Sequence, residues 1–568
     1  MIFSSNEIVI NRYISRSLLC VAISLAAVAS AFAQSSFDRP RVYDVVNYTI
    51  RVGFDAPKKT VDGDTTVTLT PLSAPLTSVD LDAVDLEFTS VRVDGESKEL
   101  QYKVGVGTVK VELGRTLRPG DKVAIHFKYT ITNPAKGVVF IAASAPSDPT
   151  KHPAQIWTQN EPEDARYWFP SFDHPSDKAT TEEFITVPKN ETAVGNGSLV
   201  DSKNNPNGTI TYHYKMDKPY STYLMSFVVG DYARLEDKHG SVPLGFYAYR
   251  DRQKVAGTAF SRTKDMMGAY ESLTGIPFAF PKYDQIMVSG FEDIDGMENL
   301  TATTLADNTI AFADFPFGRM LVDDLVSHEL AHSWFGNLVT CRNWSELWLN
   351  EGFATYMEAV WRGKSSTNKD AYVKKLLEDR QEYLADDAIQ RTHHALQNKL
   401  AKGDNSLFDA TTYQKGSLVL HMLHETVGDA AFWKAVNLYL TRHKFDNVVS
   451  ADLQAAMEEA SGQKLQWFFD QWVYAPGYPR LEVQQKYDAT AGQLQLTITQ
   501  AQKEVEGTPS AYRFPLDLSV ETPSGLVDQT LDISKHTETF DIKVPTAPTK
   551  LIFDKSEKVI LKTIKLKE

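Results

Sequence analysis

Short stretches of alternating apolar and polar residues run through the first part of the chain. Val67-Thr68-Leu69-Thr70 is typical, and similar stretches recur between about residues 38 and 238. Alternation with a period of two is the pattern of a β-strand with one buried face. The pairs Asp62-Gly63, Asp94-Gly95 and Pro119-Gly120 separate these stretches and favour tight turns. This region is therefore expected to form an antiparallel β domain.

From about Ser241 to Gly477 the pattern becomes mainly helical. The segment from Lys254 to Leu273 repeats apolar residues at helical spacing, which predicts an amphipathic helix. The segment from Asp284 to Phe291 is typical of a strand. A region that mixes helices and strands in this way is expected to be a separate domain.

After Gly477 the alternation returns. Leu494, Leu496 and Ile498 are separated by polar residues, and Phe514 to Val520 and Leu526 to Ile533 continue the pattern. We expect this region to form one small β-sandwich. The predicted fold class is multidomain α+β, with an N-terminal segment at 1–33 and domains at 34–240, 241–477 and 478–568.

Residues 1–33 have the pattern of a secretory signal peptide. Arg12 and Arg16 precede an apolar run from Leu18 to Phe32, and Ala31-Phe32-Ala33 supplies a small-residue cleavage site after Ala33. The run is too short, and too interrupted by serines, for a comfortable membrane span. The pattern predicts a Sec-type signal, a periplasmic or secreted protein and no stable membrane anchor.

Composition and charge narrow the classes of partner. The chain of 568 residues is 42% hydrophobic and 23% charged, as in globular proteins with an ample core. Its formal net charge of −14 argues against nucleic acid or an anionic membrane as a partner. Cys20 lies in the predicted signal and leaves Cys341 alone, so no intramolecular disulfide is expected in the exported protein.

One stretch in the helical region carries a metal-site pattern. His328, Glu329 and His332 stand in the order His-Glu-x-x-His, and Glu351 follows nineteen positions after His332. Residues four apart on a helix share one face, so both imidazoles can face one ion. The pattern is typical of zinc proteases, in which the intervening glutamate is the general base. Three protein ligands leave the fourth tetrahedral position open, as in catalytic zinc sites.

The residues after this motif favour a metal site over a chance match. Two histidines at helical spacing also occur on ordinary helix faces. Here Trp334-Phe335-Gly336-Asn337 supplies a helix stop, and Leu347 to Tyr356 begins a second helical pattern with Asn350 as a candidate N-cap. Glu351, near the start of that second helix, is well placed to return to the first helix.

The segment resembles the gluzincin aminopeptidases, the zinc family that contains membrane alanyl aminopeptidase and leukotriene hydrolase. The shared sequence is His-Glu-x-x-His, eighteen residues and Glu, within Gly-Asn-Leu-Val-Thr and Leu-Trp-Leu-Asn-Glu-Gly-Phe-Ala. The resemblance implies one Zn²⁺ per chain held by His328, His332 and Glu351, with Glu329 as the base. It also implies an N-terminal saddle-shaped sheet and a thermolysin-like α/β catalytic domain. The further helical domain that many members carry at the C-terminus is not expected here.

Six Asn-x-Ser/Thr sequons bear on the source of the chain. A glycan next to the candidate site would obstruct it, and two of the six lie within or beside the motifs of that site. We therefore expect a bacterial exported member of the family rather than a eukaryotic glycoprotein. The sequons are at Asn47, Asn190, Asn196, Asn207, Asn299 and Asn343.

A loop in the N-terminal region matches a substrate-binding motif of the family. It holds Gln159, Glu161, Arg166 and a Pro-x-x-Asp, formed by Pro170 and Asp173. Taken alone, it is a polar loop of the kind that faces water. The resemblance implies that Glu161 helps to hold the free ammonium of the substrate and that Gln159 contributes hydrogen bonds nearby.

A second loop resembles the Gly-Ala-Met-Glu-Asn exopeptidase motif of the family. It reads Asp295-Gly296-Met297-Glu298-Asn299, with Asp295 where the family usually has glycine. A β-carbon at that position can alter the backbone path beside the substrate, so the sequence does not fix how the substrate is positioned there. The resemblance places Gly296 to Asn299 against the substrate, with Met297 either lining the first side-chain pocket or packing in the core.

An aminopeptidase has a physical need for such acidic residues. It must recognise a charged α-ammonium beside the metal, and a carboxylate in a partly desolvated site makes a short, charge-assisted hydrogen bond with it. Two carboxylates, Glu298 and Glu161, would fix the amine and so set cleavage one residue in. An endopeptidase has no use for them, because its substrate has a neutral amide there.

Two further residues complete the candidate site. Glu358 follows Glu351 by seven positions and so shares its helix face, where it either accepts the outer N–H of a ligand histidine or is an exposed charge. Tyr413, in Tyr-Gln-Lys-Gly before an amphipathic helix, resembles the catalytic tyrosine of the family, whose phenol stabilises an oxyanion. Other metal-binding residue types are expected to be structural: His393, His394, His421, His424 and Cys341.

These residues predict a zinc aminopeptidase that removes N-terminal residues from peptides with a free N-terminus. A zinc endopeptidase and a non-catalytic binding protein on the same scaffold are the alternatives. A lipid-epoxide activity is less favoured, because the family's anchors for a substrate carboxylate lie in the helical domain that is not expected here. The sequence leaves open the preferred N-terminal residue, the physiological substrate and the oligomeric state.

Overall fold

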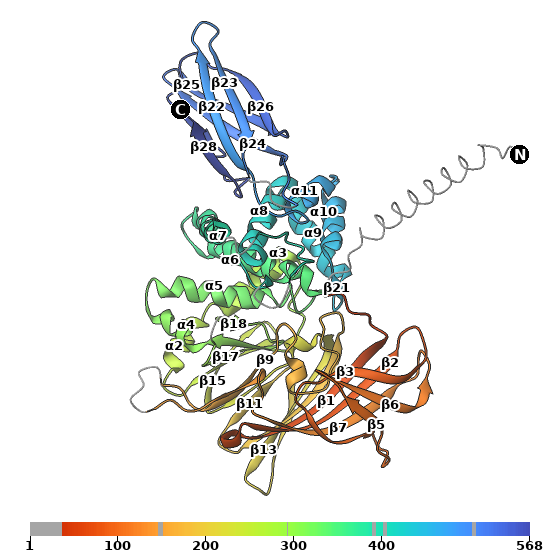
Figure 1. Cartoon of the computed structure of the whole chain (residues 1–568). Helices are drawn as coiled ribbons and strands as arrows, with labels where there is room; N and C mark the ends of the chain where they lie inside the picture. Colours follow the sequence, from red (N-terminus) through yellow and green to blue (C-terminus); the bar gives the residue numbers. More distant parts are fainter. Residues whose placement is uncertain are drawn as a thin grey trace, which may run out of the picture.

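The computed structural model describes residues 37–145, 151–291, 294–388, 393–401, 406–502 and 507–567. The predicted signal peptide lies outside the described residues. The chain forms a β-rich N-terminal region, a helical middle region and a β-rich C-terminal region (Figure 1). The multidomain α+β prediction is confirmed at this level, and the domain boundaries stay predictions.

The largest sheet of the N-terminal region has seven strands. Alternating burial along β2, with Val61, Val67 and Leu69 fully buried, confirms the period-two pattern. Most neighbours are antiparallel, but β1 and β10 pair in parallel, with Asn47 opposite Thr180. The antiparallel prediction is wrong for this pair, because β10 returns after a long connection rather than a hairpin. In sheet order the strands are β12 (Ser198–Asn204), β13 (Thr209–Tyr220), β10 (Ala179–Pro188), β1 (Tyr43–Asp55), β2 (Thr60–Pro71), β7 (Val123–Thr132) and β4 (Glu87–Val93).

Two smaller sheets complete this region. One places β9 (Gln155–Gln159) between two neighbours, so that Gln159 stands at the end of an inner strand. Its order is β11 (Thr192–Gly195), β14 (Phe227–Gly230), β9 and β8 (Gly137–Ile141). The other consists of β3 (Leu76–Asp82), β6 (Thr108–Leu117) and β5 (Gln101–Val104).

A mixed five-stranded sheet leads into the helical region. Its edge strand β18, Gly296–Met297, pairs antiparallel with β19 and carries part of the predicted exopeptidase motif. The sheet includes β15, which lies before the predicted boundary at residue 240 and pairs with β16. Its order is β15 (Tyr232–His239), β16 (Val242–Tyr249), β17 (Tyr283–Val288), β19 (Ala302–Ala306) and β18.

The helices of the middle region pack together beside this sheet (Figure 1). The predicted helix over 254–273 is two helices, because the chain turns between Phe260 and Thr263. A minimal pair, β20 (Thr340–Cys341) and β21 (Asn447–Val448), joins distant segments. The helices are α2 (Gln253–Ala259), α3 (Thr263–Thr274), α4 (Asp307–Ile310), α5 (Gly318–Ala331), α6 (Trp348–Ser365), α7 (Ala371–Ala388), α8 (Gly416–Val427), α9 (Asp429–Arg442), α10 (Ser450–Ser461) and α11 (Gln466–Trp472).

The C-terminal region consists of two small sheets. Leu494, Leu496 and Ile498 on β23 are buried, as their alternation predicts. One sheet has the order β26 (Thr537–Lys543), β23 (Gln493–Gln500), β22 (Arg480–Asp488) and β28 (Thr563–Lys567), and the other β25 (Gly525–Ile533), β24 (Phe514–Thr522) and β27 (Lys550–Phe553). Within the described residues, no helix combines the length and the apolar character needed to cross a membrane.

Candidate metal and substrate site

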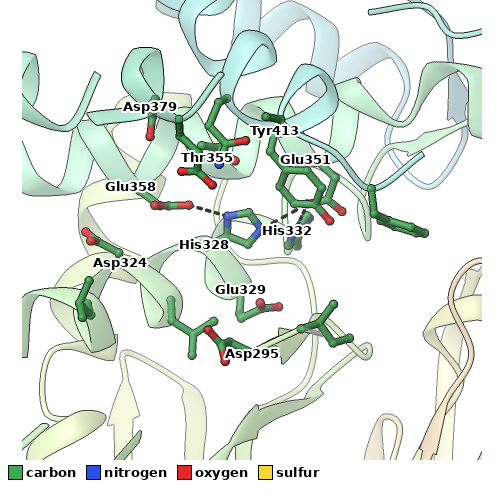
Figure 2. A pocket seen from close by; sticks show the side chains of 18 of the residues that line it. Asp295, Asp324, His328, Glu329, His332, Glu351, Thr355, Glu358, Asp379 and Tyr413 are labelled. Carbon is green, nitrogen blue, oxygen red and sulfur yellow. Dashed lines mark hydrogen bonds and ion pairs between the residues drawn. The ribbon is translucent and has the colours of Figure 1, made fainter. Parts of the chain in front are cut away.

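Helices α5 and α6 bring the three predicted metal ligands together. His328 lies in the last turn of α5, His332 follows its end, and Glu351 lies in the first turn of α6. Atoms His328 Nε2 and His332 Nε2 lie 3.2 and 3.3 Å from the same oxygen, Glu351 Oε2 (Figure 2). All three side chains can therefore contribute to one metal site.

Packing around the two helices fixes this arrangement. The rings of Phe335, just beyond α5, and Phe353, on α6, stack with centroids 4.2 Å apart. The hydroxyl of Tyr270 on α3 lies 3.2 Å from the carbonyl oxygen of Ser327 and 3.0 Å from that of Met357. These contacts hold α3 against both α5 and α6. Asn350 is not the N-cap of α6, since the helix begins at Trp348, and its side chain accepts a hydrogen bond from Cys341 N instead.

The outer nitrogen of each histidine has its own acceptor. His328 Nδ1 lies 2.7 Å from Glu358 Oε1, and His332 Nδ1 lies 2.9 Å from the carbonyl oxygen of Phe335. Each acceptor fixes the ring orientation and leaves Nε2 facing Glu351. Although burial lowers it, the contacts with Glu351 and Glu358 carry the pKa of His328 to about 9. The carboxylates of the site thus favour positive charge between them.

Behind Glu358 lies a charged network that the sequence analysis missed. Lys375 Nζ lies 2.9 Å from Glu358 Oε2 and 2.5 Å from Asp379 Oδ1. Arg362 pairs with Asp324 at 2.5 Å and with Glu378 at 2.6 Å. Helical spacing would have placed Arg362 and Glu358 on nearby faces of α6, but a charged helix face is usually solvated, so the pattern alone did not identify the network.

Glu329 is buried against the exopeptidase loop. A β-carbon added to Gly296 would lie 2.2 Å from Glu329 Oε1, so the Glu329 side chain would have to shift to admit any larger residue there. Glu329 Oε2 has no hydrogen-bond partner among the described residues. Burial raises the pKa of the Glu329 carboxyl to about 8, and the two histidines oppose that rise. A divalent ion nearby would also oppose this rise in the pKa of Glu329.

Glu161 and Glu298 meet beside the metal-ligand group. One carboxylate oxygen from each of Glu161, Glu298 and Glu351 lies within 4.8 Å of the others. Glu298 Oε1 lies 3.9 Å from His332 Nδ1. Two buried oxygens, Glu161 Oε1 and Glu298 Oε1, have no hydrogen-bond partner in the described residues. Burial raises the pKa of both carboxyls, and the neighbouring acids raise that of Glu161 further.

The other predicted substrate residues are divided between the cavity wall and the core. Gln159 donates from Nε2 toward Met297 Sδ at 3.4 Å, and its carbonyl oxygen is buried without a partner among the described residues. Met297 and Asn299 are buried and do not line the cavity. Asn299 Nδ2 donates to Thr304 Oγ1 at 3.1 Å, so it fixes the loop.

Two other residues of the motifs stabilise their loops through hydrogen bonds. Arg166 Nε donates to Asp173 Oδ2 at 3.0 Å, away from the cavity. Asp295, in place of the usual glycine, accepts a hydrogen bond from Thr309 Oγ1 at 2.8 Å and lines the cavity. Its side chain thus ties the loop to α4 and leaves Gly296 in contact with Glu329.

Tyr413 reaches the site from a single π-helical turn. The turn spans Thr411–Lys415, where Lys415 N donates to Ala410 O at 2.9 Å. The following helix α8 packs closely on α6, because a β-carbon on Gly352 would lie 3.0 Å from the α-carbon of Gly416. The Tyr413 ring lies parallel to that of His328, with centroids 6.1 Å apart (Figure 2).

These residues line one cavity of about 1050 Å³. Thr355, which the sequence analysis also missed, faces the same space: it is 2% exposed and its Oγ1 has no partner among the described residues. Its position one turn after Glu351 was the signal that could have found it. Of the predicted site residues, the cavity is lined by Gln159, Glu161, Gly296, Glu298, His328, Glu329, His332, Glu351, Glu358 and Tyr413.

The remaining histidines and the cysteine have ordinary partners. His393 and His394 contact Thr508 and Asp409, and His421 contacts Tyr372. Cys341 is fully buried, and no metal-ligand group among the described residues includes it. His424 contacts Tyr356 and Asp429. This agrees with their expected structural roles.

Comparison with known proteins identifies the family. Residues 258–472 match the Peptidase family M1 domain, and residues 42–224 match the Peptidase M1 N-terminal domain. The two matches cover both the β-rich N-terminal region and the helical region that holds the candidate site.

Several relatives extend over most of this chain. The chain is 29% identical to Aminopeptidase 2 of Candida albicans over 490 residues, 83% of this chain and 51% of that protein. It is 28% identical to Tricorn protease-interacting factor F2 of Thermoplasma acidophilum over 486 residues, 85% of this chain and 59% of that protein. It is 31% identical to Glutamyl aminopeptidase of Homo sapiens over 333 residues, 58% of this chain and 35% of that protein.

The chain spans about half the length of the curated relatives it matches. Within that span, the paired histidines and the glutamate of the metal-ligand group lie inside the matched M1 domain. The chain belongs to the M1 peptidase family.

Proposed function

We propose that this protein is a zinc aminopeptidase that releases N-terminal residues from peptides with a free N-terminus. One observation carries the proposal: the metal-ligand group lies next to two acids, half-buried Glu161 and buried Glu298, that form no ion pair with a lysine or arginine among the described residues. The names of the aminopeptidase relatives support it.

The residues present fit a zinc ion. Ligand atoms that are each about 2.0–2.1 Å from a tetrahedral zinc lie about 3.3–3.4 Å apart. The distances from Glu351 Oε2 to the two histidine Nε2 atoms are 3.2 and 3.3 Å. His328, His332 and Glu351 would hold the ion, with Glu358 and the carbonyl of Phe335 orienting the rings. When bound, zinc supplies a Lewis acid that polarises a carbonyl and acidifies water at neutral pH.

Glu329 is suited to move the proton in this reaction. Its carboxylate takes a proton from the attacking water and passes it to the departing amine. Close contact with Gly296 fixes the side chain, and the unpartnered Oε2 leaves an acceptor free for the water. A general base of this kind is worth about 10²–10⁴-fold in rate.

Glu161 and Glu298 are suited to bind the substrate ammonium. Their unpartnered oxygens are buried, and leaving such charges unpaired is costly, so a cationic amine is the complementary ligand. The amine held there places the first peptide carbonyl beside the metal-ligand group. A blocked or internal peptide bond has no charge to offer, which favours an exopeptidase over an endopeptidase.

Tyr413 is suited to stabilise the oxyanion. Its ring lies alongside His328 on the cavity wall, where its hydroxyl can donate a hydrogen bond to the carbonyl oxygen that becomes negative. A positioned donor of this kind is worth about 2.7–4 kcal/mol of barrier. Tyr413→Phe keeps the ring and removes this donor.

Metal exchange tests the proposal. Purified protein should contain about one zinc ion per chain by elemental analysis and hydrolyse at least one of a panel of aminoacyl p-nitroanilides. A chelator should abolish this activity, and added zinc should restore it. Zinc-loaded protein that hydrolyses no member of the panel would instead be a binding protein. Activity that persists without zinc would contradict the proposed chemistry.

We also propose that the protein is exported, with its signal removed after Ala33. Mass spectrometry of the N-terminal peptide from the periplasm and the medium of a producing bacterium tests this. A chain that begins at Gln34 outside the cytoplasm is expected. An uncleaved chain found only in the cytoplasm would overturn it.

A further inference from the structure

The cavity continues beyond the metal-ligand group, away from the amine-binding acids. A series of contacts gives the order along it: Glu298 lies beside His332, Glu351 lies between the two histidines, and Glu358 lies beyond His328. Helix α7 follows, since Lys375 contacts Glu358. Figure 2 shows Glu358, Thr355 and Asp379 on one side of His328, and Glu329 and Asp295 on the other.

One face of α7 forms an acidic wall of this part of the cavity. Glu378, Glu382 and Asp386 are spaced by four residues, so they lie along the same helix face, and all three line the cavity. The acids on α7 therefore follow the path that a peptide would take after its first carbonyl. A helix face of this length can contact more than one residue of such a peptide.

The lysine and the arginine on this side of the cavity already form ion pairs with acids. Lys375 pairs with Glu358 and Asp379, and Arg362 pairs with Asp324 and Glu378. By contrast, neither Glu382 nor Asp386 forms an ion pair among the described residues.

The local electrostatics show the same excess of negative charge. Partial burial raises the pKa of the Glu382 carboxyl, and the negative charges of Glu358 and Asp386 contribute to the rise although Lys375 opposes it. A cation bound between Glu382 and Asp386 would relieve this repulsion. Clefts lined by charge of one sign also attract ligands of the opposite sign over longer distances.

An independent feature indicates that a ligand passes here. Thr355 lines the same cavity on α6, is 2% exposed, and has a hydroxyl without a partner among the described residues. Buried hydroxyls usually have a hydrogen-bond partner, and a peptide group of a bound substrate would supply one.

Another wall of the cavity is apolar and exposed. Ile294, Phe312 and Leu321 line the cavity with exposed fractions of 39%, 50% and 54%. A cavity that has both an acidic helix face and an apolar wall suits a lysine or arginine side chain, because its stem packs on apolar surface while its head meets the carboxylates. A bare divalent cation fits less well, since no metal-ligand group in the described part of the chain includes a residue of α7.

We infer that the cavity prefers peptides that carry a lysine or arginine in the segment after the cleaved bond. The inference rests on the proposed aminopeptidase function and names its substrate class. It concerns Glu382 and Asp386 on α7, with Thr355 and the apolar wall as the surfaces that hold the peptide between them.

Matched peptides test the inference. Pentapeptides of alanine carrying lysine, glutamine or glutamate at position two, three or four are hydrolysed by zinc-loaded enzyme, and release of the first alanine is measured. At one position or more, kcat/KM should be higher for lysine than for glutamine by roughly three- to tenfold, and lowest for glutamate. Added salt should reduce this ratio.

Charge-neutral variants locate the effect. The double variant Glu382→Gln/Asp386→Asn should bring the lysine-to-glutamine ratio close to one. The matched control Asp217→Asn/Glu236→Gln removes two acids that are 75% and 68% exposed in the strands of the N-terminal half, and should keep the wild-type ratio. Binding of the same peptides to the Glu329→Gln enzyme gives the ratio of Kd values without turnover.

The outcomes separate this inference from the proposed function. Hydrolysis of all peptides with a ratio near one at every position would overturn the lysine preference alone. A preference that survives in Glu382→Gln/Asp386→Asn would overturn the role of α7. Absence of hydrolysis on any peptide or aminoacyl anilide would overturn the proposed function itself.

Discussion

Two groups of buried and half-buried carboxylates flank the histidine pair, and they differ in one respect. Glu358 and Asp379 share Lys375, and Asp324 is paired with Arg362. On the other side, Glu161 and Glu298 have no lysine or arginine ion partner among the described residues. Acids in such an environment are costly without a resident cation, so a cation that arrives from outside would stabilise them.

The pKa values follow this difference. Burial alone would raise the pKa of Glu358, but Lys375 and His328 hold it down at about 2. Burial raises the pKa of Glu161 well above its usual range, and neighbouring acids add to the rise. The paired group thus has the character of a structural support. The unpaired group has the character of a binding site for positive charge.

The largest effect is expected for Glu329→Gln, on the unpaired side. The substitution keeps the shape of the side chain and removes the base, so kcat should fall by about 10²–10⁴-fold. Zinc content and thermal stability should stay close to those of the wild type, because no ion pair is broken. Steady-state kinetics and elemental analysis measure this, and a variant that keeps more than a tenth of kcat would exclude Glu329 as the base.

Lys375→Met tests the paired side. Removing the shared cation leaves Glu358 and Asp379 uncompensated, and breaking a buried pair in this way costs about 3–5 kcal/mol. The calorimetric transition of the helical region should move to lower temperature. Lys215→Met, which breaks an exposed pair with Asp217 at 3.0 Å, is the control and should leave the transition temperature nearly unchanged. Equal effects of the two variants would contradict the distinction between the groups.

Glu298→Gln should show the opposite behaviour to Lys375→Met. Losing a charge-assisted hydrogen bond to the ammonium costs about 1.5–3 kcal/mol, or roughly 10- to 150-fold in kcat/KM. The metal-free protein should be as stable as the wild type or more stable, because a buried unpaired charge is removed. Kinetics on aminoacyl anilides and calorimetry of the chelated protein decide between these outcomes. A destabilised variant with full activity would assign Glu298 to the structural group.

Glu358→Gln should have the smallest effect, on metal affinity. Loss of the acceptor for His328 Nδ1–H weakens zinc binding by about 10–100-fold in typical sites. Competition with a zinc-sensitive dye measures the Kd. Glu378→Gln removes an acid of the same network that does not contact a histidine, and it should leave the Kd unchanged. A Kd that is the same in both variants would show that Glu358 does not support the ligand.

The sequence predicted the parts of the site that depend on local geometry. His328, His332 and Glu358 follow from helical spacing, and their contacts agree with it. The approach of Glu161 to Glu298 depends on how two sheets meet, which no periodicity encodes, and only the family resemblance placed them together. The sequence also did not predict that β1 and β10 pair in parallel. This pairing joins segments far apart in the chain, and no local pattern encodes it.

The sequence also did not show which charged residues on the helices are buried. Lys375 and Arg362 were not among the residues singled out from the sequence, because burial by neighbouring helices is not visible in the pattern. Asn350 has the residue type of an N-cap, yet its side chain bonds Cys341 N and the hydroxyl of Tyr223. Tertiary contacts here outweighed the capping preference.

One comparison of two substrates bears most directly on the role of the unpaired acids. A peptide with a free N-terminus and its N-acetylated copy are incubated with the zinc-loaded protein, and the products are identified by mass spectrometry. Release of the first residue from the free peptide, with the acetylated copy cleaved at least roughly tenfold more slowly, is expected from the loss of a charge-assisted contact. Equal cleavage of both peptides, or cleavage at internal bonds first, would contradict the assignment of Glu161 and Glu298 as the residues that bind the substrate amine.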